Sequence, residues 1–149
     1  MKTIRDLIGQ REAFSVDSSF TVKAVVDYLY EKGVGAVAVC DGDEIVGVFS
    51  ERDLLRRVVH KGLDPSETKI TGVMTTDVFH VSIDEKHSVA TALMLNKNFR
   101  HLVVLDEDSR LRGFISMREL LEVDLEASKD LIHKLNDDYY GQRFTLPKK

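Results

Sequence analysis

The sequence contains few of the residues on which disulfide-bonded or membrane-embedded proteins depend. It has one cysteine, two prolines and no tryptophan among 149 residues. The single cysteine, Cys40, excludes an intrachain disulfide and lies in an apolar run, where a free cysteine usually packs in the core. No apolar run approaches the roughly 18 residues that a membrane span needs. We therefore expect a soluble, cytoplasmic protein with no membrane contact.

The sequence also lacks an excess of basic residues and the common catalytic motifs. Its 25 acidic and 21 basic side chains give a net charge of −4 at pH 7. This balance repels a nucleic-acid backbone, so no nucleic-acid partner is expected. There is no glycine-rich phosphate loop or nucleophile motif, and the histidines show no metal-ligand spacing. We expect no enzyme activity, no bound metal and no required cofactor.

What the sequence does contain is an internal repeat. Residues 47–55 read GVFSERDLL and residues 113–121 read GFISMRELL. The order of the segments upstream of the two copies is also the same: residues 15–22 and 82–89, then 35–40 and 100–105. One supersecondary unit has therefore been duplicated within the chain.

Each copy predicts the order strand, helix, strand, strand, helix. Thr21 and Ser88 are expected to cap the first helices, and the continuous apolar runs predict buried strands joined to their neighbours by hairpins. Each unit is too short to bury its sheet alone. We therefore predict an α+β fold of two pseudo-two-fold-related β-α-β-β-α repeats packed through their sheets. The predicted single module, 1–149, divides into repeat 1 at 3–60, a linker at 61–69, repeat 2 at 70–125 and a C-terminal helical extension and tail at 126–149.

The duplicated pattern resembles a tandem pair of cystathionine β-synthase (CBS) domains, also called a Bateman module. The motifs that carry the resemblance are Gly47, Ser50 and Asp53, their variant Gly113, Ser116 and Glu119, the segment Val73-Met74-Thr75, and residues 100–104. It covers about residues 3–125 and is closest to the stand-alone bacterial and archaeal CBS-pair proteins. The resemblance implies binding of adenosine-containing ligands and assembly into dimers.

The resemblance also implies a ligand site between the repeats. Asp53, one turn into a helix, suits the two ribose hydroxyls, and Ser50 caps that helix beside a phosphate or ribose oxygen. Family packing brings the start of the repeat 2 strand across the cleft, so Arg100 and His101 are expected to hold a phosphate. The family usually places adenine against the first strand, which here points to Ala13, Phe14 and Val16.

A second cleft is expected to be weaker. It is assigned to Ser116, Glu119, Thr75 and Val78, with Gly35-Ala36 in place of the Arg-His pair. Ser-x-x-Asp and Ser-x-x-Glu are also capping-box patterns. We favour capping for Ser116 with Glu119 and a ligand role for Ser50 with Asp53.

Other cationic residues have alternative interpretations that need no ligand. Arg100 also fits a solvated strand end, and His101 fits a satisfied core histidine. Arg52 and Arg118 are expected on exposed helix faces, with contact to a polyphosphate as the alternative.

These observations favour a non-enzymatic sensor for an adenine nucleotide, with a role in energy sensing. A single Arg-His pair suits one phosphate, which favours AMP over ATP, ADP, NAD(H) and S-adenosylmethionine. An apolar stripe at Leu121, Leu125, Ile132 and Leu135 either covers the monomer or joins two chains, and the resemblance to CBS pairs favours a homodimer. The alternative is a structural or adaptor protein with vestigial clefts that acts through an unknown protein target.

Overall fold

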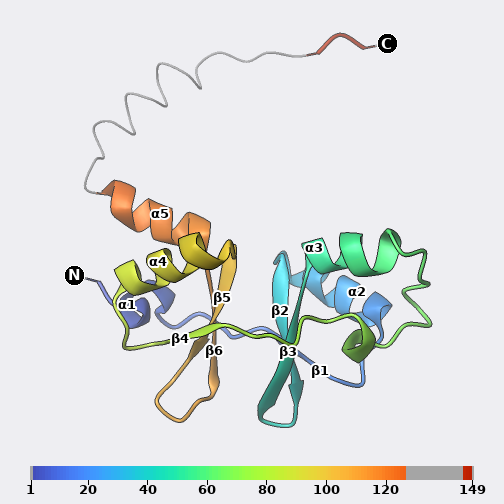
Figure 1. The fold of residues 1–149 in the computed structure, drawn as a ribbon, viewed down its shortest axis with the longest axis horizontal. Coiled ribbons are helices and arrows are strands. Elements are labelled where there is room, and N and C mark those ends of the chain that lie inside the picture. The colour runs from blue at the N-terminus through green and yellow to red at the C-terminus, as the bar shows by residue number, and fades with distance from the viewer. Residues whose placement is uncertain (1, 127–145, 149) are drawn as a thin grey trace.

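The computed structural model describes residues 2–126 and 146–148, and contains two three-stranded sheets with the strand orders β1-β2-β3 and β4-β5-β6. In each sheet the first pair of strands is parallel and the second pair is antiparallel. The sheets face each other at the centre and the helices lie outside them (Figure 1). The predicted α+β fold of two related repeats is confirmed.

Repeat 1 and repeat 2 present matching elements in the same order. In repeat 1 these are β1 (Ser15–Asp17), α2 (Val22–Lys32), β2 (Ala36–Asp41), β3 (Glu44–Ser50), α3 (Glu51–Asp53) and the π-helical η1 (Leu54–Val59). In repeat 2 they are β4 (His80–Ser82), α4 (His87–Lys97), β5 (His101–Leu105), β6 (Leu111–Ser116) and α5 (Met117–Glu126). Short helical segments precede the two repeats, α1 (Ile4–Ile8) and the 3-10 turn η2 (Ile70–Gly72).

The first helices of the two repeats begin differently. The Thr21 hydroxyl accepts from the Ala24 amide at 3.2 Å, as predicted for α2. The prediction for Ser88 was wrong, because α4 begins at His87 and Ser88 lies inside it. The His87 amide instead donates to the Lys2 carbonyl at 3.1 Å, so the N-terminal segment supplies an acceptor at this helix end.

The segments before the two repeats are exchanged between the two cores. Ile4 and Ile8 are buried in the core of repeat 2, whereas Ile70, Val73 and Met74 are buried in the core of repeat 1. Backbone bonds agree, since the Ile4 amide donates to Glu85 at 2.8 Å and the Ile70 amide donates to Phe20 at 3.0 Å. Neither repeat therefore completes its hydrophobic core without residues that precede the other.

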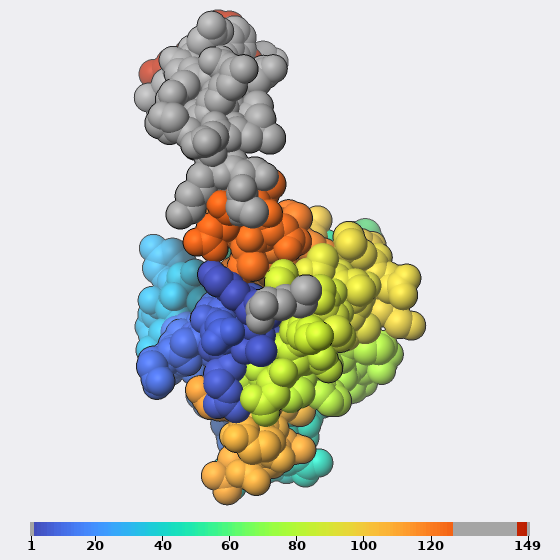
Figure 2. All heavy atoms as spheres, turned by 90° about the vertical axis from the view of Figure 1, so that its left-hand side faces the viewer, coloured from blue at the N-terminus to red at the C-terminus, as the bar shows by residue number. Residues whose placement is uncertain are grey.

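The N-terminal residues also lie on the outer surface of repeat 2. Figure 2 shows them beside α4 and below α5. Arg5 pairs with Asp84 at 2.9 Å and Lys2 with Glu126 at 3.1 Å. Of the predicted C-terminal stripe, Leu121 and Leu125 are on α5, whereas Ile132, Leu135 and most of the tail lie outside the described residues.

Gly47 allows the chain that leaves η2 to cross repeat 1 closely. A Cβ atom at this glycine would lie 2.6 Å from the Met74 sulfur and 2.9 Å from the Thr75 carbonyl oxygen. Val48 and Thr75 exchange two backbone hydrogen bonds of 2.9 Å. The glycine of the repeated motif thus directs residues 75–79 across the end of β3, beside the helix that carries Asp53.

Candidate functional site

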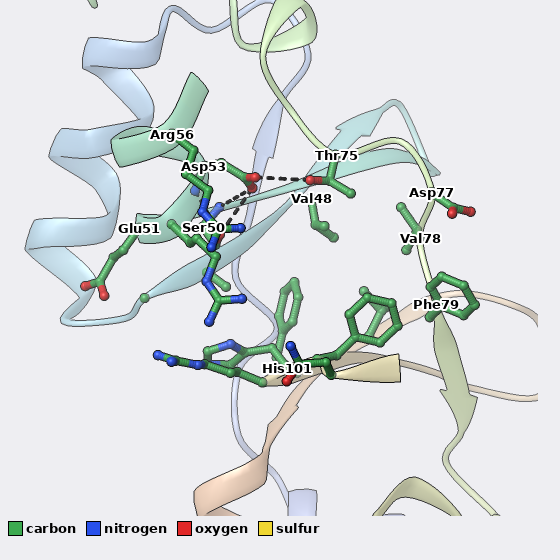
Figure 3. Close-up of a pocket in the computed structure, with 18 of the residues that line it drawn as sticks. Val48, Ser50, Glu51, Asp53, Arg56, Thr75, Asp77, Val78, Phe79 and His101 are labelled. Atoms are coloured by element: carbon green, nitrogen blue, oxygen red, sulfur yellow. Dashed lines mark hydrogen bonds between the residues drawn. The ribbon is translucent and has the colours of Figure 1, made fainter. Parts of the chain in front are cut away.

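A cavity of about 330 Å³ lies between the two repeats. Its walls come from the end of β3, from α3 and η1, from residues 75–79 and from the start of β5. Figure 3 shows Ser50, Asp53 and Arg56 on one side of it and His101 and Phe79 on the other. Both repeats therefore contribute to one cavity whose volume falls in the range of small-molecule sites.

Asp53 caps its helix and faces the cavity at the same time. One carboxylate oxygen accepts from the Ser50 amide at 3.0 Å and from its hydroxyl at 3.2 Å, which forms a capping box. The other oxygen accepts from the Thr75 hydroxyl at 3.2 Å and lies 3.6 Å from the Arg57 guanidinium. The side chain is 14% exposed. Since a carboxylate offers about four acceptor positions, capping leaves capacity for a ligand hydroxyl.

Arg100 and His101 line the opposite side of the cavity. The structure thus brings Ser50, Asp53, Arg100 and His101 to one place, as the sequence predicts. Although His101 is partly open to solvent, desolvation by the atoms around it lowers its pKa. Glu119 and Glu51 raise that pKa, Arg100 lowers it, and the net shift is downward. Desolvation thus favours the neutral form of the imidazole, whereas a bound anion would favour the charged form.

Three further arginines line the cavity, and sequence reasoning did not place them there. They are Arg52, Arg56 and Arg57, on α3 and η1. Arg57 is tied to the protein, because it donates to the Met74 carbonyl at 3.0 Å. Arg52 was expected on an exposed helix face, with contact to a polyphosphate as the alternative, and it is half-buried and lines the cavity. Arg52 and Arg56 are four residues apart on the helix that carries Asp53, and this spacing was the available signal.

The apolar part of the wall is formed by different residues from those predicted. Thr75 and Val78, assigned to the second cleft, line the cavity beside Asp53. Ala13, Phe14 and Val16, assigned to this cavity, are not among its lining residues. Val16 is 4% exposed in the core of repeat 1, and the Phe14 ring packs edge-on against another aromatic ring, 6.3 Å away between centroids. The exchange of the segments before the two repeats accounts for this regrouping.

The wall near Val78 is apolar and includes two aromatic rings. Phe79 and Phe99 pack with ring centroids 4.7 Å apart, tilted by 40°. The remaining apolar lining residues are Val48, Val103 and Phe114. Such a surface suits an aromatic heterocycle, whose face stacks on aromatic and aliphatic side chains.

The equivalent place in repeat 2 is occupied by the protein itself. Glu119 forms a capping box with Ser116, with bonds of 3.3 Å to its amide and 3.2 Å to its hydroxyl, as favoured from the sequence. The other Glu119 oxygen is bound by the Arg11 guanidinium, which also donates to the Leu7 carbonyl at 2.9 Å. A neighbouring hollow contains three carboxylates, from Glu119, Glu122 and Glu126.

Two further properties concern the part of the chain that the structure describes. No helix there is long and apolar enough to cross a membrane. Within the same residues, no three histidine, cysteine, aspartate or glutamate side chains are grouped so that they could hold a metal ion.

Comparison with known proteins identifies relatives with the same two-repeat organisation. The family model described as "CBS domain" matches residues 4–60 and 70–126. An uncharacterized protein of Methanopyrus kandleri is 29% identical over 118 residues, which are 78% of this chain and 60% of that protein. The chain thus spans less than two thirds of the length of this curated relative.

Solved structures give the same result. A putative signal-transduction protein with CBS domains from Burkholderia ambifaria is 28% identical, with a TM-score of 0.76 and coverage of 98% of this chain and 100% of that one. A CBS domain protein from Pyrobaculum aerophilum complexed with AMP is 26% identical, with a TM-score of 0.71 and coverage of 80% and 89%. The cytosolic domain of the Mg²⁺ channel MgtE in complex with ATP is 27% identical, with a TM-score of 0.63 and coverage of 74% and 44%. The two matched repeats cover most of the chain, which therefore belongs to the CBS domain family.

Proposed function

We propose that this CBS pair is a regulatory module that binds an adenosine-containing ligand in the cavity beside Asp53. The observation that carries the proposal is the composition of this one cavity. A carboxylate from repeat 1, a cation and a histidine from repeat 2 and an apolar wall surround a volume of about 330 Å³. These are the groups that ribose, phosphate and adenine require.

Each part of the ligand has a partner in this proposal. The ribose hydroxyls donate to Asp53, with the Thr75 hydroxyl turning away from the oxygen that it now contacts at 3.2 Å. Adenine lies against Val78 and Phe79. Arg100 and His101 hold the phosphate nearest the ribose. AMP therefore contains every group for which the proposal names a partner. ADP, ATP, NAD(H) and S-adenosylmethionine share its adenosine part.

Regulation follows from the position of the cavity between the repeats. A ligand held by Asp53 of repeat 1 and Arg100 of repeat 2 favours the relative arrangement of the repeats in which both contacts form. The shift is limited by the difference in ligand affinity between the arrangements. The protein target that responds to the shift is a separate question.

Thermal unfolding with AMP, ADP, ATP, NADH and S-adenosylmethionine tests the proposal. A ligand at about 100 times its dissociation constant adds about 2.7 kcal/mol of stability. Asp53→Asn keeps an oxygen for the helix cap but loses the charge, and should lower the affinity about 100-fold. Glu119→Gln, the matched change in repeat 2, should leave the affinity unaltered. Binding that survives Asp53→Asn at full strength would overturn the proposal.

We also propose that the chain forms a homodimer through the helices that follow the two hairpins. Leu55 and Val59 on η1 are 61% and 60% exposed, and Leu121 and Leu125 on α5 are 48% and 47% exposed. Leu55 corresponds to Leu121 and Val59 to Leu125 in the duplicated pattern. Exposed apolar side chains at equivalent positions favour a symmetric contact. Sedimentation velocity should give a dimer that Leu55→Glu with Leu121→Glu dissociates.

The same apolar faces support the second candidate function, an adaptor that binds another protein. In that case the wild-type chain is a monomer in sedimentation velocity. Its thermal unfolding is also unaffected by every nucleotide in the panel. The two candidate functions therefore give opposite results in the same two measurements.

A further inference from the structure

We infer that the cavity takes a nucleotide with at least two phosphate groups, and that Arg52 and Arg56 contact the phosphates beyond the first. This inference rests on the proposed function and names the class of ligand. It replaces the preference for AMP, which depended on a single Arg-His pair. The cavity contains four arginines instead of one.

The arginines differ in what they already bind. Arg57 donates to the Met74 carbonyl and lies beside Asp53, so its charge is used within the protein. Among the described residues, no hydrogen bond or ion pair involves the guanidinium group of Arg52, Arg56 or Arg100, although the Arg100 backbone carbonyl accepts from the Met117 amide at 2.9 Å. Three guanidinium groups thus border one cavity without a direct counter-ion from these residues. They repel one another until an anion enters.

The carboxylates that line the cavity balance only part of this charge. Asp53 lies beside Arg57, and the other two are Glu51 and Asp77. Figure 3 shows Glu51 at one edge of the view and Asp77 at the opposite edge, on either side of the region between Ser50 and His101. The four arginines that line the cavity thus outnumber its three carboxylates, Glu51, Asp53 and Asp77.

The number of guanidinium groups in the cavity distinguishes a ligand with one phosphate from a ligand with several. A terminal phosphate carries about −1.5 to −2 charges at pH 7, and each added phosphate contributes a further charge. A monophosphate is matched by Arg100 and one neighbour, which leaves a guanidinium without an anion. A diphosphate or triphosphate supplies an oxygen pair for each of Arg52, Arg56 and Arg100, and guanidinium groups bind such pairs in bidentate geometry.

The helix that carries these arginines has an unusual form. Arg56 lies in the π-helical segment η1, where the His60 amide donates to the Leu55 carbonyl at 2.9 Å, five residues back. π-helical turns are rare and are frequent at functional sites. In repeat 2 the matching segment is the regular helix α5, in which Glu122 takes the place of Arg56 and pairs with Arg118 at 3.2 Å. The unpaired arginines are thus specific to the Asp53 cavity.

Calorimetric titration of the full chain with AMP, ADP and ATP, without added metal, tests the inference. The wild type should bind ADP and ATP at least about tenfold more tightly than AMP, because each adds a charge-assisted contact. Arg56→Gln and Arg52→Gln should each remove most of that preference and affect AMP much less. Arg56→Lys should restore part of it. The matched control Arg118→Gln should leave the preference as it is, and circular dichroism should report an unchanged fold for each variant.

Two different failures can be told apart. If the wild type binds AMP as tightly as ATP, the inference about several phosphates is overturned and the proposed function stands. If no adenine nucleotide binds, the proposed function fails and the inference fails with it. A preference for ATP that survives both arginine substitutions would overturn the assignment of Arg52 and Arg56.

Discussion

The two repeats have the same turn from strand to helix, but different groups contact the carboxylate in that turn. In both, a strand ends at a serine whose hydroxyl and amide bind a carboxylate three residues later. The remaining oxygen of Asp53 accepts from the Thr75 hydroxyl, lies 3.6 Å from the Arg57 guanidinium and borders a cavity, whereas that of Glu119 is bound directly by Arg11. The repeated motif therefore determines the turn from strand to helix, but not what contacts its carboxylate. The group that approaches the carboxylate decides whether a ligand has room.

The segments that deliver these partners are also where the two cores depend on each other. Ile70 and Ile4 are both fully buried, each in the core of the opposite repeat. Ile70→Ala and Ile4→Ala should each lower the free energy of unfolding by about 2–5 kcal/mol. Ile70→Ala should also accelerate amide exchange first in α2, and Ile4→Ala first in α4. The reverse pattern of exchange would contradict the crossed packing.

The duplicated pattern was sufficient to predict the fold because the same sequence segments occur twice in the same order. The α+β class and the two packed repeats are confirmed, and Asp53 does share a cavity with Arg100 and His101. The pattern could not reveal the exchange of the segments before the repeats, since hydrophobic periodicity does not say which core an apolar face joins. That is why Val78 lines the Asp53 cavity and Phe14 does not.

The arginines were missed for another physical reason. A regular helix after Ser50 is the natural expectation, and the π-helical form of η1 depends on packing that sequence periodicity does not report. The four-residue spacing of Arg52 and Arg56 places both on one helix face, but it does not say that this face lines the cavity. Ser88 is a similar case, because a backbone carbonyl from the N-terminal segment binds at the helix end where a cap was expected.

Substitution of the equivalent glycines, Gly47 and Gly113, by alanine should have a smaller effect on stability than the isoleucine substitutions. Gly47→Ala places a Cβ atom 2.9 Å from the Thr75 carbonyl and closer still to Met74, so residues 74 and 75 must shift. A Cβ atom at Gly113 would lie 3.7 Å from the nearest side-chain atom, that of Ile8. Gly113 has a φ of +147°, however, which a residue with a side chain rarely adopts. Each substitution should cost about 1–3 kcal/mol of stability.

Only the first substitution should also weaken nucleotide binding, because only Gly47→Ala displaces Thr75 from Asp53. Urea unfolding and a nucleotide titration of both variants measure the two effects. Equal loss of nucleotide affinity in the two variants would contradict the assignment of ligand binding to repeat 1.

The smallest expected effect is a pH dependence of stability that arises from His101. Repeat 1 has no matching group, because His101 corresponds to Ala36 in the duplicated pattern. Desolvation lowers the pKa of His101 in the folded state, Arg100 adds to this, and Glu119 and Glu51 oppose it. The folded state therefore binds fewer protons, and stability falls as pH drops through the unfolded-state pKa of about 6.5. His101→Gln should flatten this part of the stability profile, and bound nucleotide should reduce the fall.

A steeper loss of stability in His101→Gln than in the wild type between pH 7 and pH 5.5 would contradict this sign. Chemical unfolding at a series of pH values, with and without ATP, provides the measurement.

The asymmetry of the two clefts is tested most directly by the stoichiometry of nucleotide binding to the full chain. Calorimetric titration with ATP should give one bound nucleotide per chain. Asp53→Asn should abolish this signal at the concentrations used, and Glu119→Gln should leave both the stoichiometry and the affinity unchanged. Two equivalent nucleotides per chain, or equal losses from Asp53→Asn and Glu119→Gln, would contradict a single site in the Asp53 cavity.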